Sequence, residues 1–311
     1  MSLRFKHANT SFILSTSKIS DNSLKRRIDE IIRVVFKGFE ENNDLELGFS
    51  FEFTDHLESY LSDDDYYHQI DNIKENNSQL HFNDAELNLV VNYKESIEVI
   101  IEIKDDKNLI PKFRFYNKSY KNNLELQITT FYYRVFLLFS QLWNIKNNFS
   151  YIHASSITDS NKDAILFTAD SGVGKSSLLF RIAQENKYSF IADDLAIIDN
   201  DSNVYYQGRN LSVKPYHLKY FPFLKKIIYD RMSIGQRLQW LFLNDNRLTS
   251  RIDSSLLFNS KCDSANLDKI IHLCNHSKSE FQIKKISSDN LLNMTIPILN
   301  NEFFLSFSKL D

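Results

Sequence analysis

The stretch Ala169-Asp170-Ser171-Gly172-Val173-Gly174-Lys175-Ser176 decides how the second half of this chain folds. It fits the pattern Gly/Ala-x-x-x-x-Gly-Lys-Ser, in which two late glycines let successive backbone N–H groups point at one anion. A short apolar strand is expected just before it, at Ala164–Thr168. A helix is expected to begin near Lys175, so its positive N-terminal end adds to the site. In this strand–loop–helix context the stretch predicts a phosphate loop that binds a nucleoside triphosphate.

The side chains of the phosphate loop carry separate expectations. Lys175 is expected to reach the β- and γ-phosphates, and the Ser176 hydroxyl to ligate Mg²⁺. A glycine-rich turn that happens to precede a helix is the alternative, but it leaves the lysine, the hydroxyl and both glycines unexplained. Ala169 in the first position is tolerable if its φ is negative. The predicted nucleotide-binding residues are Asp170, Ser171, Gly172, Val173, Gly174, Lys175, Ser176 and Ser177.

An acidic pair, Asp193-Asp194, follows another expected strand, Tyr188–Ala192, only 18 and 19 residues after Lys175. One of these carboxylates can hold Mg²⁺, and the other can accept the proton of an attacking hydroxyl. A surface Asp-Asp turn between two strands is the alternative. The position at a strand end beside the phosphate loop favours the functional interpretation.

These motifs together resemble the HPr kinase-like family, which is related to the phosphoenolpyruvate carboxykinase fold. The matching residues run from His153-Ala154-Ser155 through the phosphate loop to Ala192-Asp193-Asp194, and the match extends to about Asn200. Weaker resemblance continues at Gly208-Arg209 and Lys269–Leu273. The resemblance implies an ATP- and Mg²⁺-dependent kinase whose acceptor is a serine hydroxyl.

The resemblance also implies roles for single residues. It makes Asp193 the general base, makes Asp194 the partner of the metal and the phosphate loop, and puts His153 near the reacting centre. Without the family, His153 is read as a structural residue, because a single histidine at a strand start more often satisfies a hydrogen bond.

The sequence also departs from the family in two ways. No Glu-Ile/Val-Arg-Gly segment, which helps HPr kinases to recognise their protein substrate, follows Asp194. The N-terminal half has no match to the regulatory domain of those enzymes. The resemblance therefore points to a divergent member, like kinases of free serine or of lasso peptides. Its expected acceptor is a peptide, a small protein or free serine.

A cationic side chain after the acidic pair is expected to neutralise the transferring phosphoryl group. Arg209 is ranked first because it follows Gly208 at a turn after an expected strand, and plain surface charge is the alternative for every candidate. The expected catalytic set is thus Asp193, His153, Lys175 and Arg209. The candidates for the phosphoryl charge are Arg209, Lys214, Arg247 and Arg251.

Two other clusters invite a metal interpretation. His272, Cys274 and His276 fall on one face of an expected strand, but no fourth zinc ligand is evident, and a core strand with a polar end is favoured. Asp63, Asp64 and Asp65 form an acidic run that is better explained as a solvated loop than as a cation site.

The composition excludes several protein classes. A net charge of −3 offers no basic surface for nucleic acid, and no apolar run approaches the length of a membrane span. The two cysteines, Cys262 and Cys274, predict a reducing compartment, and with no signal-peptide pattern at the N-terminus the expected location is the cytoplasm.

The chain, 311 residues long, is expected to hold two domains. Residues 1–147 predict a strand-rich α+β domain for substrate docking or oligomerisation, with a helix around 24–39 and a long buried helix at 124–145. Residues 148–311 predict an α/β P-loop kinase core of the HPr kinase type. The competing hypothesis is a regulator that senses ATP or ADP, or another nucleotide, without phosphate transfer, and the Asp193→Asn variant is expected to separate the two. A motor-type ATPase is disfavoured because no distant acidic strand is present.

Overall fold

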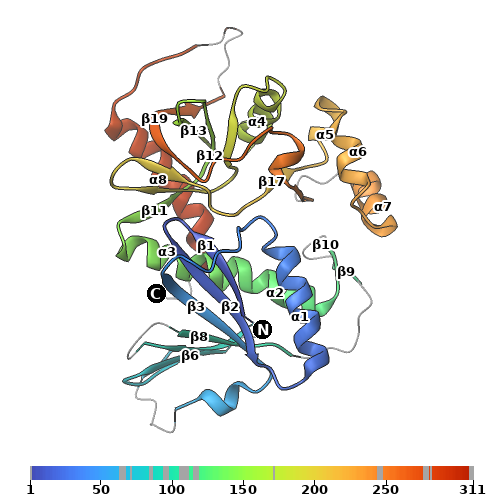
Figure 1. Ribbon diagram of the computed structural model, residues 1–311, viewed down its shortest axis with the longest axis vertical. Helices are drawn as coiled ribbons and strands as arrows, with labels where there is room; N and C mark the ends of the chain where they lie inside the picture. Colours follow the sequence, from blue (N-terminus) through green and yellow to red (C-terminus); the bar gives the residue numbers. More distant parts are fainter. Residues whose placement is uncertain are drawn as a thin grey trace. The chain divides into compact units, whose positions relative to one another are not determined.

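The protein is described by a computed structural model covering residues 2–62, 68–70, 72–83, 87–93, 98–104, 112–114, 119–170, 172–243, 248–275, 280 and 282–307. The chain forms two compact units, Met1–Trp143 and Asn144–Asp311 (Figure 1). The sequence predicted the division four residues later, between 147 and 148. Both units mix helices with sheets, as expected for an α/β (α+β) protein. Four predicted features lie outside the described residues: the acidic run 63–65, Ser171, Arg247 and His276.

The first unit is built on an eight-stranded sheet of order β1-β2-β3-β8-β7-β6-β5-β4. The β2–β3 and β3–β8 pairs are parallel and the other pairs are antiparallel. Helix α1 connects β2 to β3, and it begins where the Asp21 carboxylate accepts the backbone N–H groups of Ser23 and Leu24. The elements are β1 Ser2–His7, β2 Thr10–Lys18, α1 Asn22–Val35, β3 Leu47–Thr54, η1 Leu57–Tyr60, β4 His68–Ile70, β5 Ile73–Glu75, β6 Gln79–Asn83, β7 Asn88–Asn92, β8 Glu98–Glu102, β9 Lys112–Arg114 and β10 Ser119–Lys121.

The long helix predicted at 124–145 is confirmed as three consecutive segments: α2 Asn123–Phe131, the π-helical turn Tyr132–Phe136 and α3 Leu137–Lys146. Its start is fixed by a capping box between Asn122 and Glu125. Phe136 is fully buried, and its ring lies 4.9 Å from that of Phe12 and 5.2 Å from that of Phe36. Aromatic residues thus form the centre of the core of this unit.

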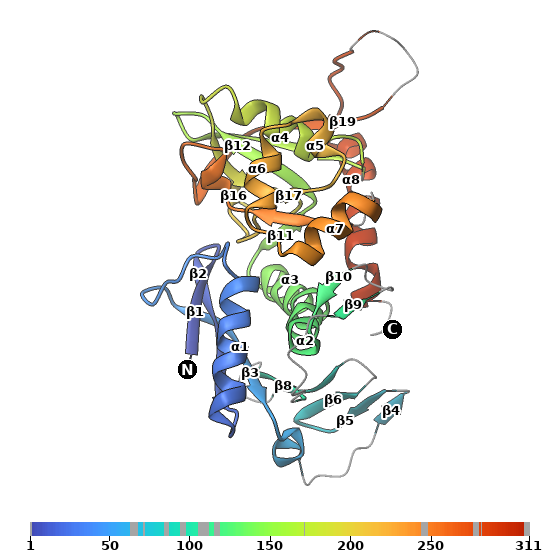
Figure 2. The same cartoon turned by 90° about the vertical axis from the view of Figure 1, so that its right-hand side faces the viewer.

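The second unit contains a seven-stranded sheet of order β11-β15-β16-β19-β13-β12-β14 and a separate β17–β18 pair (Figure 2). Strand β13 is the one that leads into the phosphate loop. It pairs antiparallel with β12 and parallel with β19. The elements are β11 Phe149–Ile152, β12 Ala154–Thr158, β13 Asp163–Ala169, α4 Lys175–Ala183, β14 Ser189–Ala192, β15 Ala196–Asp199, β16 Asn203–Tyr205, β17 Leu211–Val213, α5 His217–Tyr220, α6 Leu224–Tyr229, α7 Ile234–Leu243, β18 Ser250–Ile252, η3 Ser254–Leu256, β19 Ser264–Leu273 and α8 Ser288–Phe307.

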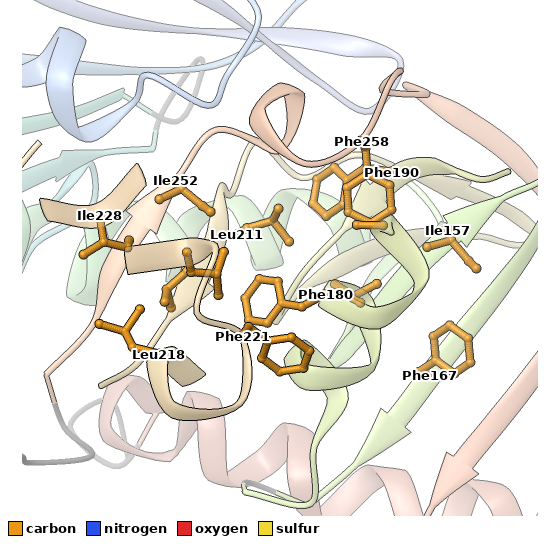
Figure 3. Packing of buried hydrophobic residues seen from close by; sticks show 14 of the residues in the cluster. Ile157, Phe167, Phe180, Phe190, Leu211, Leu218, Phe221, Ile228, Ile252 and Phe258 are labelled. Atoms are coloured by element: carbon orange, nitrogen blue, oxygen red, sulfur yellow. The ribbon is translucent and has the colours of Figure 1, made fainter. Parts of the chain in front are cut away.

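An apolar core anchors helix α4, which carries the lysine and serine of the phosphate loop. Phe180 of α4 is fully buried, and its ring lies 5.5 Å from that of Phe221 (Figure 3). The same cluster includes Leu211 of β17 and Ile252 of β18, so the strand pair and the helix share one core. Fully burying a side chain of this size contributes about 1.5–3 kcal/mol. The core therefore holds the start of α4 and the β17–β18 pair in fixed positions. Among the described residues no helix is long and apolar enough to cross a membrane.

Candidate functional site

The predicted phosphate loop leaves the sheet where β13 ends, at Ala169, and α4 begins at Lys175. Gly172 and Gly174 have φ angles of 86° and 121°, in the region that side chains with a Cβ rarely adopt. Gly174 is the residue before the helix and offers no side-chain cap, and the first α4 bond runs from Leu178 N to Gly174 O over 2.9 Å. The earlier N–H groups of a helix lack partners within the helix, so this N-terminus has the geometry of an anion site.

Lys175 is held against the loop that it terminates. Its side chain is 7% exposed, and Nζ donates a hydrogen bond of 2.6 Å to the carbonyl oxygen of Ala169. A buried ammonium that binds a backbone carbonyl is a strong donor already aimed into the loop. Of the other predicted loop residues, Asp170 and Gly172 are exposed, while Val173, Gly174, Ser176 and Ser177 are partly buried or buried.

Asp193 lies at the centre of a buried hydrogen-bond network. Its Oδ1 accepts the hydroxyl of Ser176 at 3.1 Å and that of Ser155 at 3.0 Å. Its Oδ2 accepts the backbone N–H of Ser212 at 2.8 Å. The register explains the Ser155 contact, since β12 and β14 pair Ser156 with Ala192 and so put the next residues opposite each other. The carboxylate is fully buried, and this burial and the neighbouring Asp194 raise its pKa.

Asp194 points to different partners because the backbone turns between the two carboxylates. It has a φ of 68°, and Leu195 N bonds back to Asp193 O at 2.9 Å across it, which closes a tight three-residue turn. Its Oδ2 lies 3.8 Å from Arg209 Nη1 and 3.5 Å from Arg251 Nη2. Burial alone would raise the pKa of Asp194, but the two guanidinium groups overcome it and lower the pKa.

Arg251 is positioned by the small β17–β18 pair. The register sets Arg251 opposite Ser212, the residue whose N–H binds Asp193. Its Nη1 also donates to Asn210 O at 3.0 Å, which fixes the guanidinium plane. One strand pair thus serves both members of the acidic pair. Arg209, ranked first from the sequence, and Arg251, another candidate, both form an ion pair with Asp194.

No family model and no curated protein matches this sequence. The resemblance to HPr kinase-like enzymes therefore rests on the sequence motifs alone.

His153 lies between β11 and β12, at the same edge of the sheet as the phosphate loop. The register pairs Ala154 with Thr168, which brings His153 level with Ala169. The side chain is 7% exposed, and burial, aided by Lys175 and Arg209, lowers its pKa to about 4 against the attraction of Asp194. The imidazole is therefore neutral at pH 7, and it lies close enough to Asp194 for the two groups to interact.

The site holds oxygen ligands of the kind that Mg²⁺ prefers. Ser176 Oγ and Asp193 Oδ1 are 3.1 Å apart, so a hydroxyl and a carboxylate meet beside the helix N-terminus. Mg²⁺ is usually held by one or two protein ligands, with the rest supplied by water and phosphate oxygens. The residues fit that ion. Asp194, which the family resemblance makes a metal ligand, has ion pairs with Arg209 and Arg251. Among the described residues no group of three or more His, Cys, Asp or Glu side chains could hold a metal; His276 lies outside them, so the His272–Cys274–His276 cluster stays an untested prediction.

Two contributors to the site were missed from the sequence. Ser155 sits in the His153-Ala154-Ser155 motif but was given no role, and Ser212 was not singled out at all. The signal for Ser155 was its place opposite the residue after Ala192, which only the strand pairing reveals. Ser212 contributes its backbone N–H, which does not depend on the side chain, so the residue type gives no signal of this role. Lys214, a predicted candidate, uses its own backbone N–H to bond His217 Nδ1 at 3.0 Å, and no contact with the acidic pair is recorded for it.

Proposed function

We propose that this protein is an ATP- and Mg²⁺-dependent phosphotransferase that passes the γ-phosphate to a hydroxyl, with the serine of a peptide, a small protein or free serine as acceptor. The observation that carries the proposal is the 3.1 Å hydrogen bond between Ser176 of the phosphate loop and Asp193. Residues 17 positions apart meet where a nucleotide's terminal phosphates would lie, and a second carboxylate follows directly. A loop that only binds phosphate needs no such second carboxylate.

The hydrogen bonds support roles for the acidic pair that are the reverse of those implied by the family resemblance. Asp193 is fully buried and accepts hydrogen bonds from Ser155, Ser176 and Ser212, and Ser176 is itself the expected Mg²⁺ ligand, so this carboxylate is directed at the metal side of the phosphates. Asp194 keeps 27% of its side chain exposed and makes only long contacts with the arginines. A general base must first be within reach of its proton. We therefore assign Asp193 to the metal side, with Ser176, and Asp194 to the acceptor hydroxyl.

The lowered pKa of Asp194 is compatible with this role. Arg209 and Arg251 lower that pKa while no phosphate competes for them. When the γ-phosphate arrives, the guanidinium groups gain a second anion to bind, so their hold on Asp194 weakens and its basicity rises. The transition state of phosphoryl transfer is also loose and needs positioning more than strong base catalysis.

The remaining residues of the chain have supporting tasks. The N–H groups at the start of α4 and the Lys175 ammonium bind the β- and γ-phosphates. Mg²⁺, when bound at Ser176 and Asp193, neutralises charge between these phosphates. Arg209 and Arg251 stabilise the negative charge that spreads over the transferring group. Neutral His153 can donate or accept a hydrogen bond beside Asp194 without adding charge.

The test is transfer of label from γ-labelled ATP to free serine, to serine-containing peptides and to a cell extract from which the chain itself has been removed. The proposal predicts a labelled product that is stable to acid and labile to alkali, as serine phosphate esters are. Lys175→Met is expected to abolish labelling, because it removes the charge that holds the phosphates. Lys225→Met, a loss of the same charge at an exposed position of α6 in the second unit, is the matched control.

The competing hypothesis is a nucleotide-sensing regulator. If the wild-type protein binds Mg·ATP but transfers label to none of these acceptors and releases no free phosphate, that hypothesis replaces the present one. If label appears only as free phosphate, the protein is a hydrolase, and the acceptor role of Asp194 is wrong.

A further inference from the structure

The end of strand β19 reaches the edge of the sheet from which the phosphate loop leaves, and the proposed transfer chemistry does not use it. Strands β13 and β19 are parallel, and the register pairs Thr168 with His272 and Ala169 with Leu273. Cys274 therefore follows at the level where the loop begins. Open α/β sheets bind ligands outside the carboxyl ends of their parallel strands, so this strand end lies where a ligand is expected.

The strand order puts this end on the side of β13 that lies away from the acidic pair. The neighbours run β19-β13-β12-β14, of which Figure 1 labels β19, β13 and β12. Asp193 and Asp194 follow β14, and His153 precedes β12. In the proposed function the terminal phosphate of the nucleotide lies at the acidic pair and the middle phosphate lies over the start of α4. The nucleoside then extends to the opposite side of β13. That side is the end of β19.

His272 is held in an orientation that suits a ligand contact. Its Nδ1 lies 2.9 Å from the hydroxyl of Thr168, a fully buried side chain of the strand that carries the phosphate loop. When this hydroxyl donates to Nδ1, the ring proton is on Nε2, which can then donate outward. Partial burial lowers the pKa of His272, and Asp170 and Lys175 act on it in opposite directions, so the ring lies within the electrostatic field of the phosphate loop.

We propose that the end of β19, from His272 to Asn275, forms the nucleoside-binding side of the site, with His272 hydrogen-bonded to a ribose hydroxyl of a nucleoside di- or triphosphate. This inference rests on the proposed function, because it takes the direction of the phosphate chain from the acidic pair. The ribose and the base are the parts of the ligand that the phosphate loop does not recognise.

The two cysteines of the chain provide a test, since they lie at opposite ends of β19. Cys262 precedes the strand and donates its thiol to Ser264 O, whereas Cys274 follows the strand and is exposed. The rate of N-ethylmaleimide modification is measured for Cys274 in a Cys262→Ser variant and for Cys262 in a Cys274→Ser variant. Each rate is measured without ligand, with saturating Mg·ADP and with saturating Mg·tripolyphosphate.

Mg·ADP is expected to slow the modification of Cys274 by about tenfold, because a bound ribose and base would cover the thiol, while tripolyphosphate, which lacks them, has little effect. Cys262 is expected to react equally in all three conditions. Equal protection of Cys274 by both ligands, or protection by neither when both bind, would overturn the inference.

Titration calorimetry gives an independent measurement. His272→Ala is expected to weaken Mg·ADP binding by about tenfold, the scale of one lost hydrogen bond to a ligand, and to leave tripolyphosphate binding unchanged. His56→Ala, an exposed histidine of the first unit, is the control. A loss that is equal for both ligands would mean that His272 contacts phosphate instead of ribose, and no loss for either ligand would also overturn the inference. If the wild-type protein binds neither ligand, the proposed function itself has failed.

Discussion

The replacement Asp194→Asn tests whether the charge balance of the acidic pair is as the structure describes it. The carboxylate is favoured by Arg209 and Arg251, which lower its pKa from 3.8 to about 2. At 1.36 kcal/mol per pKa unit, a shift of this size corresponds to about 2 kcal/mol of stability at neutral pH. The neutral amide of Asn loses this contribution to the stability. The substitution also removes the repulsion between the two carboxylates that raises the pKa of Asp193, and this restores part of the lost stability. The expected net destabilisation is therefore about 1–2 kcal/mol.

The pH dependence follows from the sign of the shift. A carboxyl group whose folded-state pKa is lowered contributes stability that is present above its unfolded pKa and is lost as the pH falls through the folded pKa. The contribution of Asp194 to the gap between wild type and Asp194→Asn is complete at neutral pH and is lost between about pH 4 and pH 2. Because Asp193, whose pKa is raised to about 6, becomes protonated as the pH falls below that value, the offsetting repulsion disappears first, and the gap should be widest near about pH 5. Urea unfolding in a Trp143→Phe background follows the second unit through Trp240, which is 7% exposed there.

Asp201→Asn provides the matched control, since it is the same chemical change at an exposed position of the same unit. It should shift the unfolding midpoint by much less than Asp194→Asn does. The reasoning is refuted if Asp194→Asn is as stable as the wild type at neutral pH, or if the gap between them widens as the pH falls below 4.

Three further predictions concern the core, the loop and the histidine. Phe136→Ala removes a fully buried ring at the centre of the aromatic core and should cost about 3–5 kcal/mol in urea unfolding, whereas Phe242→Ala, at a side chain that is 79% exposed, should cost little. Gly174→Ala should weaken Mg·ATP binding by about tenfold or more in calorimetry, because a φ of 121° is strained for any side chain; unchanged affinity would mean that the loop amides do not bind phosphate. With the pKa of His153 lowered to about 4, kcat/KM of the wild type and of His153→Gln should share one pH profile from about pH 6 to 8, and an inflection present only in the wild type would contradict the neutral imidazole.

The parts of the fold that were predictable from the sequence are those with a local pattern. The phosphate-loop strand and helix, now β13 and α4, follow from the glycine spacing and the apolar runs on either side. The helix from Asn123 to Lys146 follows from its nearly continuous apolar residues, although the π-helical turn in its middle has no sequence signal. The helix Ser288–Phe307 was not predicted, since Pro297 inside it normally argues for a break.

The candidate site was predictable as a set of residues but not as a set of contacts. The acidic pair, His153 and the loop were all named, because motifs fix their order and spacing. Their partners depend on strands of three residues, β17 and β18, which lie 36 residues apart and pair only in the folded chain. That pairing brings Arg251 to Asp194 and the Ser212 N–H to Asp193. The same pairing gives different partners to the two carboxylates, which are identical in type and adjacent in sequence.

The central claim, that Asp194 faces a hydroxyl acceptor while Asp193 belongs to the metal side, is tested most directly by measuring transfer and binding in the same samples. Mg·ATP affinity by calorimetry and the initial rate of label transfer are compared for the wild type, Asp194→Asn and Asp193→Asn. Asp194→Asn should lose transfer by about 10²–10⁴-fold with its Mg·ATP affinity nearly intact. Asp193→Asn should lose transfer together with the Mg²⁺ dependence of ATP binding. Full transfer by Asp194→Asn, or Mg²⁺-dependent binding that survives in Asp193→Asn and fails in Asp194→Asn, would contradict the account.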